Sequence, residues 1–349
     1  MSWLLYGANG YSGELIAREA VRRGLRPILA GRSRAPVEAL ARELGLEARV
    51  FALDDDEPPT RFLEGTALVL HCAGPFAATA VPVMAACLAA HAHYLDITGE
   101  IAVFELARAR DAAARAAGVV LCPGVGFDVV PTDCVAACLK AALPEATALA
   151  LGFDGQSAMS RGTARTMIEG LAQGGCVRRD GTLTRVPLGY RDRRIDFGAG
   201  EKLAATIPWG DVSTAFHTTG IPNIEVYVPV SPRALAGLRR LRYVRPLLGL
   251  GPVQRFLKAR VDRRPPGPDE QQRDATPTRV WGEARAADGR VKTARLTTAN
   301  GYTVTVAAAL GIVERLLGGG APAGALTPAR LMGARYVETL PGSGRIAID

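Results

Sequence analysis

Short apolar runs alternate with helix-length segments over the first 124 residues of this 349-residue chain. Each run is short and is bounded by glycine, proline or polar residues, which is typical of buried parallel strands. Segments with helical spacing lie between them, such as 13–24 and 103–118, and each ends in glycine. The alternation predicts an α/β fold with a doubly wound parallel sheet of the Rossmann type. The six expected strands are SWLLYGA (2–8), PILAG (27–31), ARVFAL (48–53), ALVLHCA (67–73), HYLDIT (93–98) and VVLCPG (119–124).

The rhythm changes after Pro131. One more helix is expected over 132–143, and the polar, glycine-rich stretches beyond it indicate a second, α+β domain with antiparallel strands. Three later features are predicted: a loop or partly disordered excursion (263–277), a hairpin that turns at Asp288-Gly289 (279–298), and a helix (302–320).

Composition excludes several classes of protein. The chain is 48% hydrophobic and 22% charged, as an ordinary globular protein is, and its net charge of +8 is carried almost entirely by arginine. No basic stripe interleaved with aromatic residues is present, which argues against nucleic-acid binding. The six cysteines lie mostly in apolar runs without a C-x-x-C pair, as buried thiols in a reducing cytoplasm would. With no secretory leader and no long apolar span, we expect a cytoplasmic protein without an integral membrane segment.

Three glycines follow the first expected strand in the heptad GANGYSG, residues 7–13. A strand that runs into such a turn and then into a helix presents backbone N–H groups where a pyrophosphate can be held. Gly7 permits the tight turn, Gly10 lets the phosphates approach, and Gly13 lets the helix pack close to the sheet. Glycine turns also join strands to helices for steric reasons alone, but the position after the first strand favours a dinucleotide site.

The second expected strand ends in AGRS, residues 30–33. An NAD enzyme usually carries an acidic residue here, which accepts hydrogen bonds from the ribose hydroxyls. Arg32 and Ser33 stand in its place, and a guanidinium can pair with a 2′-phosphate, so NADP is favoured over NAD. The alternative is that Arg32 is one more surface arginine.

Two further turns follow expected strands at the edge where such sheets bind ligands. Gly74-Pro75-Phe76 follows the fourth strand, as a rigid turn where the nicotinamide ribose would pass. Asp96 ends the fifth strand and is followed by Thr98, Gly99 and Glu100. Ordinary turn and helix-cap chemistry accounts for both turns equally well.

A hydride-transfer enzyme usually needs a proton donor within hydrogen-bond reach of its substrate. His217 can instead be a structural histidine, and Asp128 can instead cap a helix that begins near Pro131. Water can also deliver the proton. No paired His or Cys spacing is present, so no catalytic metal is expected. The candidate catalytic residues are Tyr94, Asp96, Asp128 and His217, with Asp133 as a further candidate donor.

The motifs GANGYSG, AGRS, CAGPF, HYLDITGE and PGVGFDVVPTD, in this order, resemble the saccharopine-dehydrogenase-like oxidoreductases. The resemblance is strongest to their bacterial branch, which includes trans-acting enoyl reductases, and it returns at SRGT (160–163), NGYTVT (300–305) and GALTPARLMG (324–333). It implies a Rossmann domain at 1–130, a substrate and dimerisation domain at 131–299, and a C-terminal segment, 300–349, that returns to the first domain. The cofactor contacts it implies are Gly7, Asn9, Gly10, Tyr11, Ser12, Gly13, Arg32, Ser33, Gly74, Pro75 and Phe76.

This resemblance makes an NADPH-dependent reductase of a C=C bond in an acyl or polyketide-like substrate the leading interpretation, with a free or carrier-bound substrate. The chain lacks the long insertions of the lysine-pathway enzymes, and their saccharopine-binding residues have no match. Reduction of a C=N or C=O bond is the alternative within the enzyme class. A non-catalytic NADP-binding or interaction protein is the alternative outside it. A homo-oligomer is expected.

Residues 233–264 form a basic, amphipathic stretch. Its leucines at 235, 238, 241 and 248 can share one helical face, beside arginines at 239, 240, 242 and 245. Such a stretch can dock an acidic acyl carrier protein, lie on an anionic membrane or cover a lipid-like substrate. Packing on the second domain, or in a dimer interface, is the structural alternative.

Overall fold

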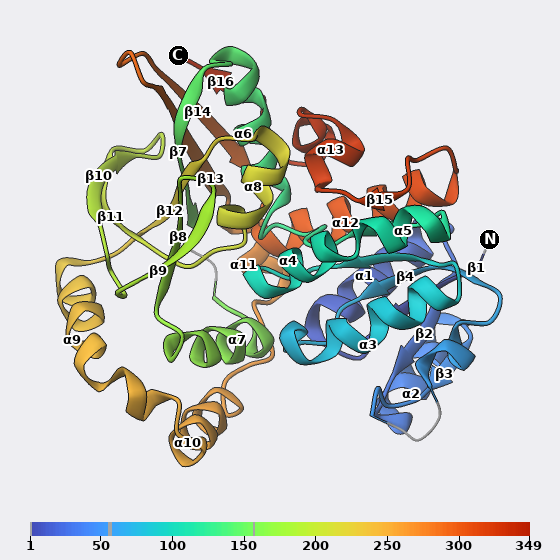
Figure 1. Cartoon of the computed structure of the whole chain (residues 1–349). Helices are drawn as coiled ribbons and strands as arrows, with labels where there is room; N and C mark the ends of the chain where they lie inside the picture. Colours follow the sequence, from blue (N-terminus) through green and yellow to red (C-terminus); the bar gives the residue numbers. More distant parts are fainter. Residues whose placement is uncertain (1, 55–57, 156–157) are drawn as a thin grey trace. The chain divides into compact units, whose positions relative to one another are not determined.

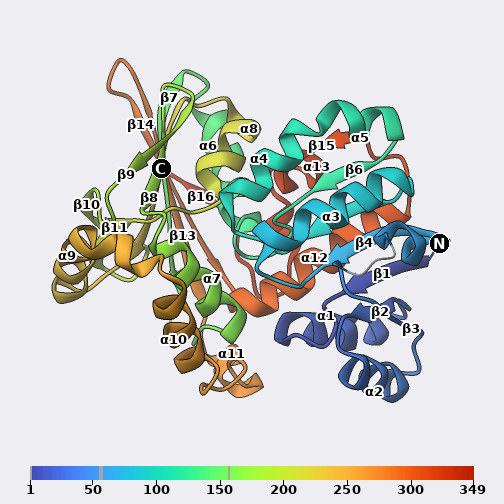
Figure 2. The ribbon, with the colours of Figure 1, turned by 60° about the horizontal axis from the view of Figure 1, so that its bottom comes forward.

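The computed structural model describes residues 2–54, 58–155 and 158–349, apart from the side chains at 242 and 244–246. Its contacts divide the chain into two compact units, and each is described by itself (Figures 1 and 2). The first contains residues up to Val130 and the returning segment Tyr302–Met332, and the second contains Pro131–Gly301 and Gly333–Asp349.

The first unit is built on a parallel sheet with the strand order β15-β6-β5-β4-β1-β2-β3. The order reverses beside β1, which pairs with both β2 and β4, and such a switch point is where open α/β sheets bind ligands. The doubly wound fold predicted from the alternation is confirmed. The strands are β1 (Ser2–Tyr6), β2 (Ile28–Gly31), β3 (Ala48–Val50), β4 (Thr66–His71), β5 (His93–Asp96), β6 (Val120–Cys122) and β15 (Gly324–Ala325).

Helices cover both faces of this sheet (Figure 1). One layer contains α3 (Phe76–Ala89), α4 (Ile101–Ala109) and α5 (Asp111–Ala117). The other contains α1 (Tyr11–Arg22), α2 (Arg34–Leu44) and the long helix α12 (Gly301–Leu317). The strands contribute fully buried side chains such as Leu4, Val69 and Leu121 to the core beneath α3, α4 and α5. Two short helices, η1 (Pro59–Leu63) and α13 (Pro328–Met332), complete the unit.

The helix expected over 103–118 is in fact two helices, α4 and α5. Arg110 leaves helical geometry between them, with φ −98° and ψ 8°. Asp111 opens α5, and its carboxylate accepts hydrogen bonds from the Ala325 N–H at 2.8 Å and from Arg115 at 2.9 Å. The break lets the Asp111 side chain hold the distant strand β15, which local spacing does not reveal.

The second unit is built on a mixed sheet with the strand order β10-β11-β12-β7-β13-β14-β16 and a β8–β9 hairpin attached to β12. Among the strands in the described residues of this unit, only β12 and β7 pair in parallel, as expected for an α+β domain. The hairpin predicted at 279–298 is confirmed and turns at Gly289, whose φ is +90°. The strands are β7 (Ala146–Gly155), β8 (Gly175–Arg179), β9 (Thr182–Val186), β10 (Asp192–Asp196), β11 (Glu201–Thr206), β12 (Asn223–Pro229), β13 (Thr278–Ala286), β14 (Val291–Thr298) and β16 (Ala347–Ile348).

One face of this sheet is covered by helices α6 (Val130–Ala142) and α8 (Asp211–Thr219) (Figure 1). A Cβ on Gly282 would lie 2.6 Å from Val135 and 2.8 Å from Leu139, so this glycine lets α6 approach β13 closely. The remaining helices are α7 (Arg161–Leu171), α9 (Pro232–Leu248), α10 (Gly251–Val261), α11 (Glu270–Ala275) and η2 (Tyr336–Thr339).

Two expectations need correction in this unit. Residues 263–277 are not wholly a loop, because α11 forms there and the Asp269 side chain caps it by accepting a hydrogen bond from the Gln272 N–H at 2.8 Å. The segment 300–349 does not return to the first unit as one piece. Tyr302–Met332 does return, whereas the last residues belong to the second unit because β16 pairs with β14.

Candidate functional site

The glycine loop lies at the switch point of the first sheet. The Gly7 and Ala8 N–H groups donate to the Ala30 carbonyl at 2.8 and 3.1 Å, which ties the loop to β2. Gly7 has φ +83°, and a Cβ there would lie 2.7 Å from the Ala73 nitrogen. A Cβ on Gly13 would lie 2.2 Å from the Gly7 oxygen, so α1 begins directly against the loop. These two positions require glycine on steric grounds.

Gly10 differs from its two neighbours in the motif. It is the N-cap residue of α1, is exposed, and has φ −81°, which any residue can adopt. A Cβ here would meet only the Gly7 oxygen, at 3.3 Å. As a glycine, Gly10 supplies no side-chain cap to α1, so the N–H groups of the first turn suit an anion. A side chain at position 10 would therefore disturb the fold much less than one at position 7 or 13.

The AGRS turn lies beside the glycine loop. A Cβ on Gly31 would lie 3.1 Å from Asn9 Oδ1, which joins the two motifs across the ends of β1 and β2. Arg32 and Ser33 are exposed, and Ser33 is the N-cap of α2 without a side-chain cap hydrogen bond. The expected cofactor residues of these motifs thus gather at one edge of the sheet. Tyr11 and Ser12 are half-buried there, and the Tyr11 ring meets that of Tyr302 edge-on at 5.0 Å.

The Gly74-Pro75-Phe76 turn is held by side chains that our sequence analysis did not assign to it. Glu100 accepts hydrogen bonds from the Phe76 and Ala77 N–H groups at 2.8 and 2.7 Å, and so caps α3 from a separate loop. Thr79 donates to the Ala73 carbonyl at 2.8 Å, and its hydroxyl lies 2.8 Å from His71 Nε2. The turn therefore presents a fixed shape to the site, and its helix start is occupied by a carboxylate, unlike that of α1.

His71 is fully buried behind this turn. Burial lowers the pKa of its imidazole to about 3, so the ring is neutral at physiological pH. A neutral ring can hold Thr79 without placing a charge in the core. No sequence signal pointed to His71, since its partners are brought to it only by the packing of α3 on β4.

Tyr94 and Asp96 are both fully buried at β5. The Tyr94 hydroxyl donates to one carboxylate oxygen of Asp96 at 2.7 Å, and the other oxygen accepts the N–H groups of Thr98 at 2.9 Å and Gly124 at 2.8 Å. Burial raises the pKa of Asp96 to about 6, against the opposing effect of these hydrogen bonds. We propose that the pair joins the ends of β5 and β6, and does not serve as a proton donor to substrate.

Asp128 lies in the loop between β6 and α6 and is half-buried. Its Oδ2 lies 2.9 Å from where a Cβ on Gly99 would stand, so the absence of a side chain at Gly99 makes room for the carboxyl group. Burial raises the pKa of Asp128 to about 7. The neighbouring Phe127 N–H donates to Thr305 Oγ1 on α12 at 3.0 Å, which fixes the loop. Among the expected donors in the first unit, Tyr94 and Asp96 are fully buried, whereas Asp128 is half-buried as a residue and has a pKa near neutrality.

His217 and Asp133 belong to the second unit. His217 is half-buried on α8, and its ring lies 5.5 Å from that of Phe216. Asp133 is fully buried on α6 and accepts a hydrogen bond from the Thr218 hydroxyl at 2.5 Å. This contact joins the two helices that cover the second sheet, which is a structural role for Asp133.

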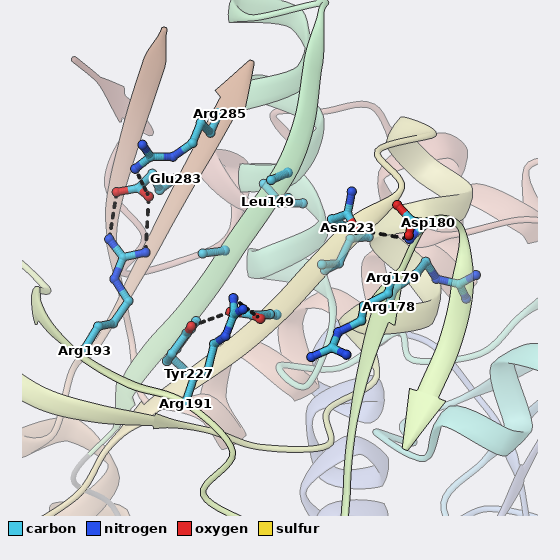
Figure 3. Close-up of a pocket in the computed structure, with 14 residues that line it drawn as sticks. Leu149, Arg178, Arg179, Asp180, Arg191, Arg193, Asn223, Tyr227, Glu283 and Arg285 are labelled. Atoms are coloured by element: carbon cyan, nitrogen blue, oxygen red, sulfur yellow. Dashed lines mark hydrogen bonds and ion pairs between the residues drawn. The ribbon is translucent and has the colours of Figure 1, made fainter. Parts of the chain in front are cut away.

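A groove of about 380 Å³ lies on the other face of the second sheet (Figure 3). Ala148 and Ala150 of β7 line it between two rows of longer side chains. Glu283 pairs with Arg193 through two hydrogen bonds, at 3.2 and 2.9 Å, and Glu225 accepts one from Arg191 at 2.9 Å. The groove's other arginines are likewise bonded to protein groups: Arg178 to two carbonyls, Arg179 to the Tyr190 hydroxyl and Arg285 to Glu283. Because protein groups already engage these guanidinium groups, the groove offers no ready-made anion site.

Neither a metal site nor a membrane-spanning helix is found in residues 2–54, 58–155 and 158–349. Within them, no three His, Cys, Asp or Glu side chains come together as a metal site would need. Across the same residues, none of the helices combines the length and the apolar character that crossing a bilayer demands.

Known proteins resemble this chain in sequence and in fold. Residues 3–122 match the saccharopine dehydrogenase NADP binding domain. The chain is 34% identical over 143 residues to a trans-acting enoyl reductase of Mycobacterium bovis, a match that covers 37% of this chain and 33% of that protein. The corresponding protein of Mycobacterium leprae is 34% identical over 140 residues, with the same coverage. The match therefore spans about a third of the length of these curated relatives.

Two solved structures share the fold across the whole chain. Saccharopine dehydrogenase (L-Glu forming) from Saccharomyces cerevisiae superposes with a TM-score of 0.67 at 12% identity, covering 100% of this chain and 99% of that one. Homospermidine synthase from Legionella pneumophila, solved in complex with NAD, gives a TM-score of 0.61 at 11% identity, covering 100% and 91%. At such identities the likeness concerns the fold alone, and it confirms the predicted fold class.

Proposed function

Residues 3–122 belong to the saccharopine dehydrogenase family of NADP-binding domains, and from this premise we propose that the chain is an NADPH-dependent reductase. Its favoured substrate is the C=C bond of an acyl or polyketide-like group, free or bound to a carrier. The observation that carries the proposal is the uncapped start of α1 beside Arg32, at the switch point of the sheet. The enoyl substrate is favoured because curated relatives that are 34% identical over about 140 residues are named trans-acting enoyl reductases.

The residues present fit the cofactor. Gly10 is exposed at the start of α1, where a side chain would stand in the path of a ligand, and the first-turn N–H groups of α1 suit a pyrophosphate. Arg32, exposed at the end of β2, would pair with the 2′-phosphate. When bound, NADPH supplies a hydride equivalent, and reduction of a C=C bond needs one proton in addition.

We assign delivery of that proton to Asp128. Its carboxyl lies at the same carboxyl-terminal edge of the sheet as the glycine loop, and burial raises its pKa to about 7, so a large fraction is protonated at neutral pH. The substrate anion would take the proton at the carbon next to the thioester carbonyl, and solvent would then reprotonate Asp128. Gly99 has no side chain, and this leaves the space that the Asp128 carboxyl occupies.

The test measures NADPH oxidation with an enoyl thioester and, separately, with a keto acid plus an amine. We expect turnover with the enoyl thioester. The rate should fall as the pH rises through about 7, because Asp128 then loses its proton. Asp128→Asn should lower kcat by about 100-fold or more without weakening NADPH binding. Asp288→Asn, an exposed carboxylate at a hairpin turn, is the matched control.

Each of the other possible results favours one of the alternative functions or proton donors. Turnover only with the keto acid and amine would favour C=N reduction. NADPH binding without turnover of either substrate would favour a binding protein. Full activity of Asp128→Asn would remove its assignment as the donor and leave water in that role.

We also propose that the protein is cytoplasmic and forms a homo-oligomer. All six cysteines are free thiols, as suits a reducing compartment. Sedimentation of the purified chain would test the oligomer, and a monomer at all concentrations would refute it.

A further inference from the structure

Helices α9 and α10 carry apolar side chains that the second unit leaves in water. Of the described large apolar residues that are exposed, four lie between 243 and 256: Tyr243 is 72% exposed, Leu247 55%, Leu250 50% and Phe256 63%. Two more, Met159 and Met167, lie at or near α7, against which α10 packs. We call Tyr243, Leu247, Leu250 and Phe256, with Arg240 and Arg255, the α9–α10 surface. Isolated exposed apolar residues are ordinary, but such a concentration on neighbouring helices marks an interaction site.

Other side chains anchor the helices to the second unit. Leu235, near the start of α9, is buried, and its side chain lies 3.1 Å from where a Cβ on Gly189 would stand. Lys258 pairs with Glu169 of α7 at 2.5 Å, and Gln254 donates to the Ile168 carbonyl at 3.1 Å. Tyr243 and Leu247 are four residues apart, so they share one face of α9, about a third of a turn away from Leu235. The helices are therefore anchored through Lys258 and Gln254, and they leave Tyr243, Leu247 and Phe256 largely exposed.

The charge of this segment has one sign. Residues 232–261 contain seven arginines, one lysine and no acidic residue. Arg239 pairs with Asp192 at 2.5 Å, and Lys258 pairs with Glu169. Arg240, Arg255 and Arg260 are exposed, and the ion pairs found in the described ranges do not include them. The α9–α10 surface thus combines aromatic and leucine side chains with available cations.

The combination of apolar and basic side chains indicates which kind of partner can bind the α9–α10 surface. A second copy docked through the same face would bring two acid-free, basic segments together, which like charge opposes. An acidic protein would neutralise the arginines but offers no evident place for four apolar side chains. An anionic bilayer accepts both groups, since apolar side chains enter the acyl boundary while arginines bind lipid phosphates.

We propose that the α9–α10 surface binds the surface of an anionic phospholipid membrane. The contact is peripheral, because it uses side chains of amphipathic helices that lie along the lipid headgroups. It rests on observations independent of the proposed reductase activity, and an inactive protein would bind vesicles equally well.

The experiment is flotation of the full chain with vesicles of phosphatidylcholine alone and of phosphatidylcholine mixed equally with phosphatidylglycerol. We expect binding to the mixed vesicles only, weakened by salt because arginines contribute. Leu247→Glu combined with Phe256→Glu should reduce this binding about tenfold or more. The matched control is Val81→Glu combined with Val291→Glu, which makes the same change at two exposed valines elsewhere and should leave binding intact.

Both double variants are checked for NADPH binding and for thermal unfolding, so that a folding defect is recognised. If Leu247→Glu/Phe256→Glu does not fold, Arg240→Glu combined with Arg255→Glu replaces it, with the same expected loss. Equal binding to both kinds of vesicle, or undiminished binding by a folded variant, would overturn the proposal. So would conversion of a dimer to a monomer by the variant without any vesicle binding by the parent chain, since the surface would then join two copies.

Discussion

At the scale of the residue, two carboxyl groups at the ends of adjacent strands show how the surroundings of a side chain determine its role. Asp96 is fully buried, and its two carboxylate oxygens accept hydrogen bonds from Tyr94, Thr98 and Gly124. Asp128, in contrast, is half-buried in a loop. Burial raises both pKa values, to about 6 and about 7. Spacing in the sequence made the two equal candidates, and only their surroundings distinguish a group that holds strands together from one that can exchange a proton.

Arg32 allows a test of cofactor choice at this same scale. Replacing Arg32 with alanine removes the guanidinium expected on the 2′-phosphate and should weaken NADPH binding about tenfold or more, while NADH binding changes little. The measurement is the dissociation constant of each cofactor by fluorescence titration. Arg34→Ala, a neighbouring exposed arginine paired with Glu38, is the control. Equal losses for both cofactors in Arg32→Ala would contradict the assignment.

At the scale of the element, the β1–α1 junction contains two glycines that the fold needs and one, Gly10, that we propose the ligand needs. A Cβ on Gly13 would collide with the Gly7 oxygen at 2.2 Å, whereas one on Gly10 would stand 3.3 Å from it at an exposed position. The same motif thus contains a packing constraint and a binding constraint, which the pattern G-x-x-G-x-x-G alone does not distinguish.

This difference predicts opposite outcomes for two substitutions. Gly10→Val should retain the fold and its melting temperature to within a few degrees but lose most NADPH binding, because the side chain would occupy the phosphate site. Gly13→Ala should lower the free energy of unfolding by about 1–3 kcal/mol, since overpacking forces backbone to move. Thermal unfolding and NADPH titration of both variants make the comparison. Normal NADPH affinity in a folded Gly10→Val protein would be inconsistent with a phosphate loop.

At the scale of the whole molecule, buried carboxyl groups couple stability to pH. The folded pKa of Asp96, about 6, lies above the value of about 3.9 expected in the unfolded chain. The folded state therefore binds more protons between these values, and the contribution of Asp96 to stability is fully present below about pH 4 and is lost as the pH rises through 6. Other carboxylates, such as Asp111 and Glu283, are held by arginines that lower their pKa. Their contribution to stability is therefore lost as the pH falls.

Asp96→Asn isolates this effect. The asparagine can still accept the Thr98 and Gly124 N–H groups but cannot titrate. Urea unfolding at pH 4 and at pH 7 should show the parent chain losing about 2–3 kcal/mol relative to the variant across this range. A constant difference between the two proteins would mean that Asp96 has an ordinary pKa.

The sequence by itself determined the features that depend on neighbours along the chain. The strand and helix alternation, the glycine loop, the Arg32 turn and the hairpin at Gly289 follow from residue periodicity and backbone preference within a few positions, and the fold class they predicted is confirmed. Tertiary structure alone decided what depends on distant partners. Glu100 caps α3, Asp111 breaks a helix to hold β15, Asp96 is buried between two strand ends, and α9 and α10 leave apolar groups in water. Burial and long-range hydrogen bonds arise only when the chain packs, so no local pattern could assign these roles.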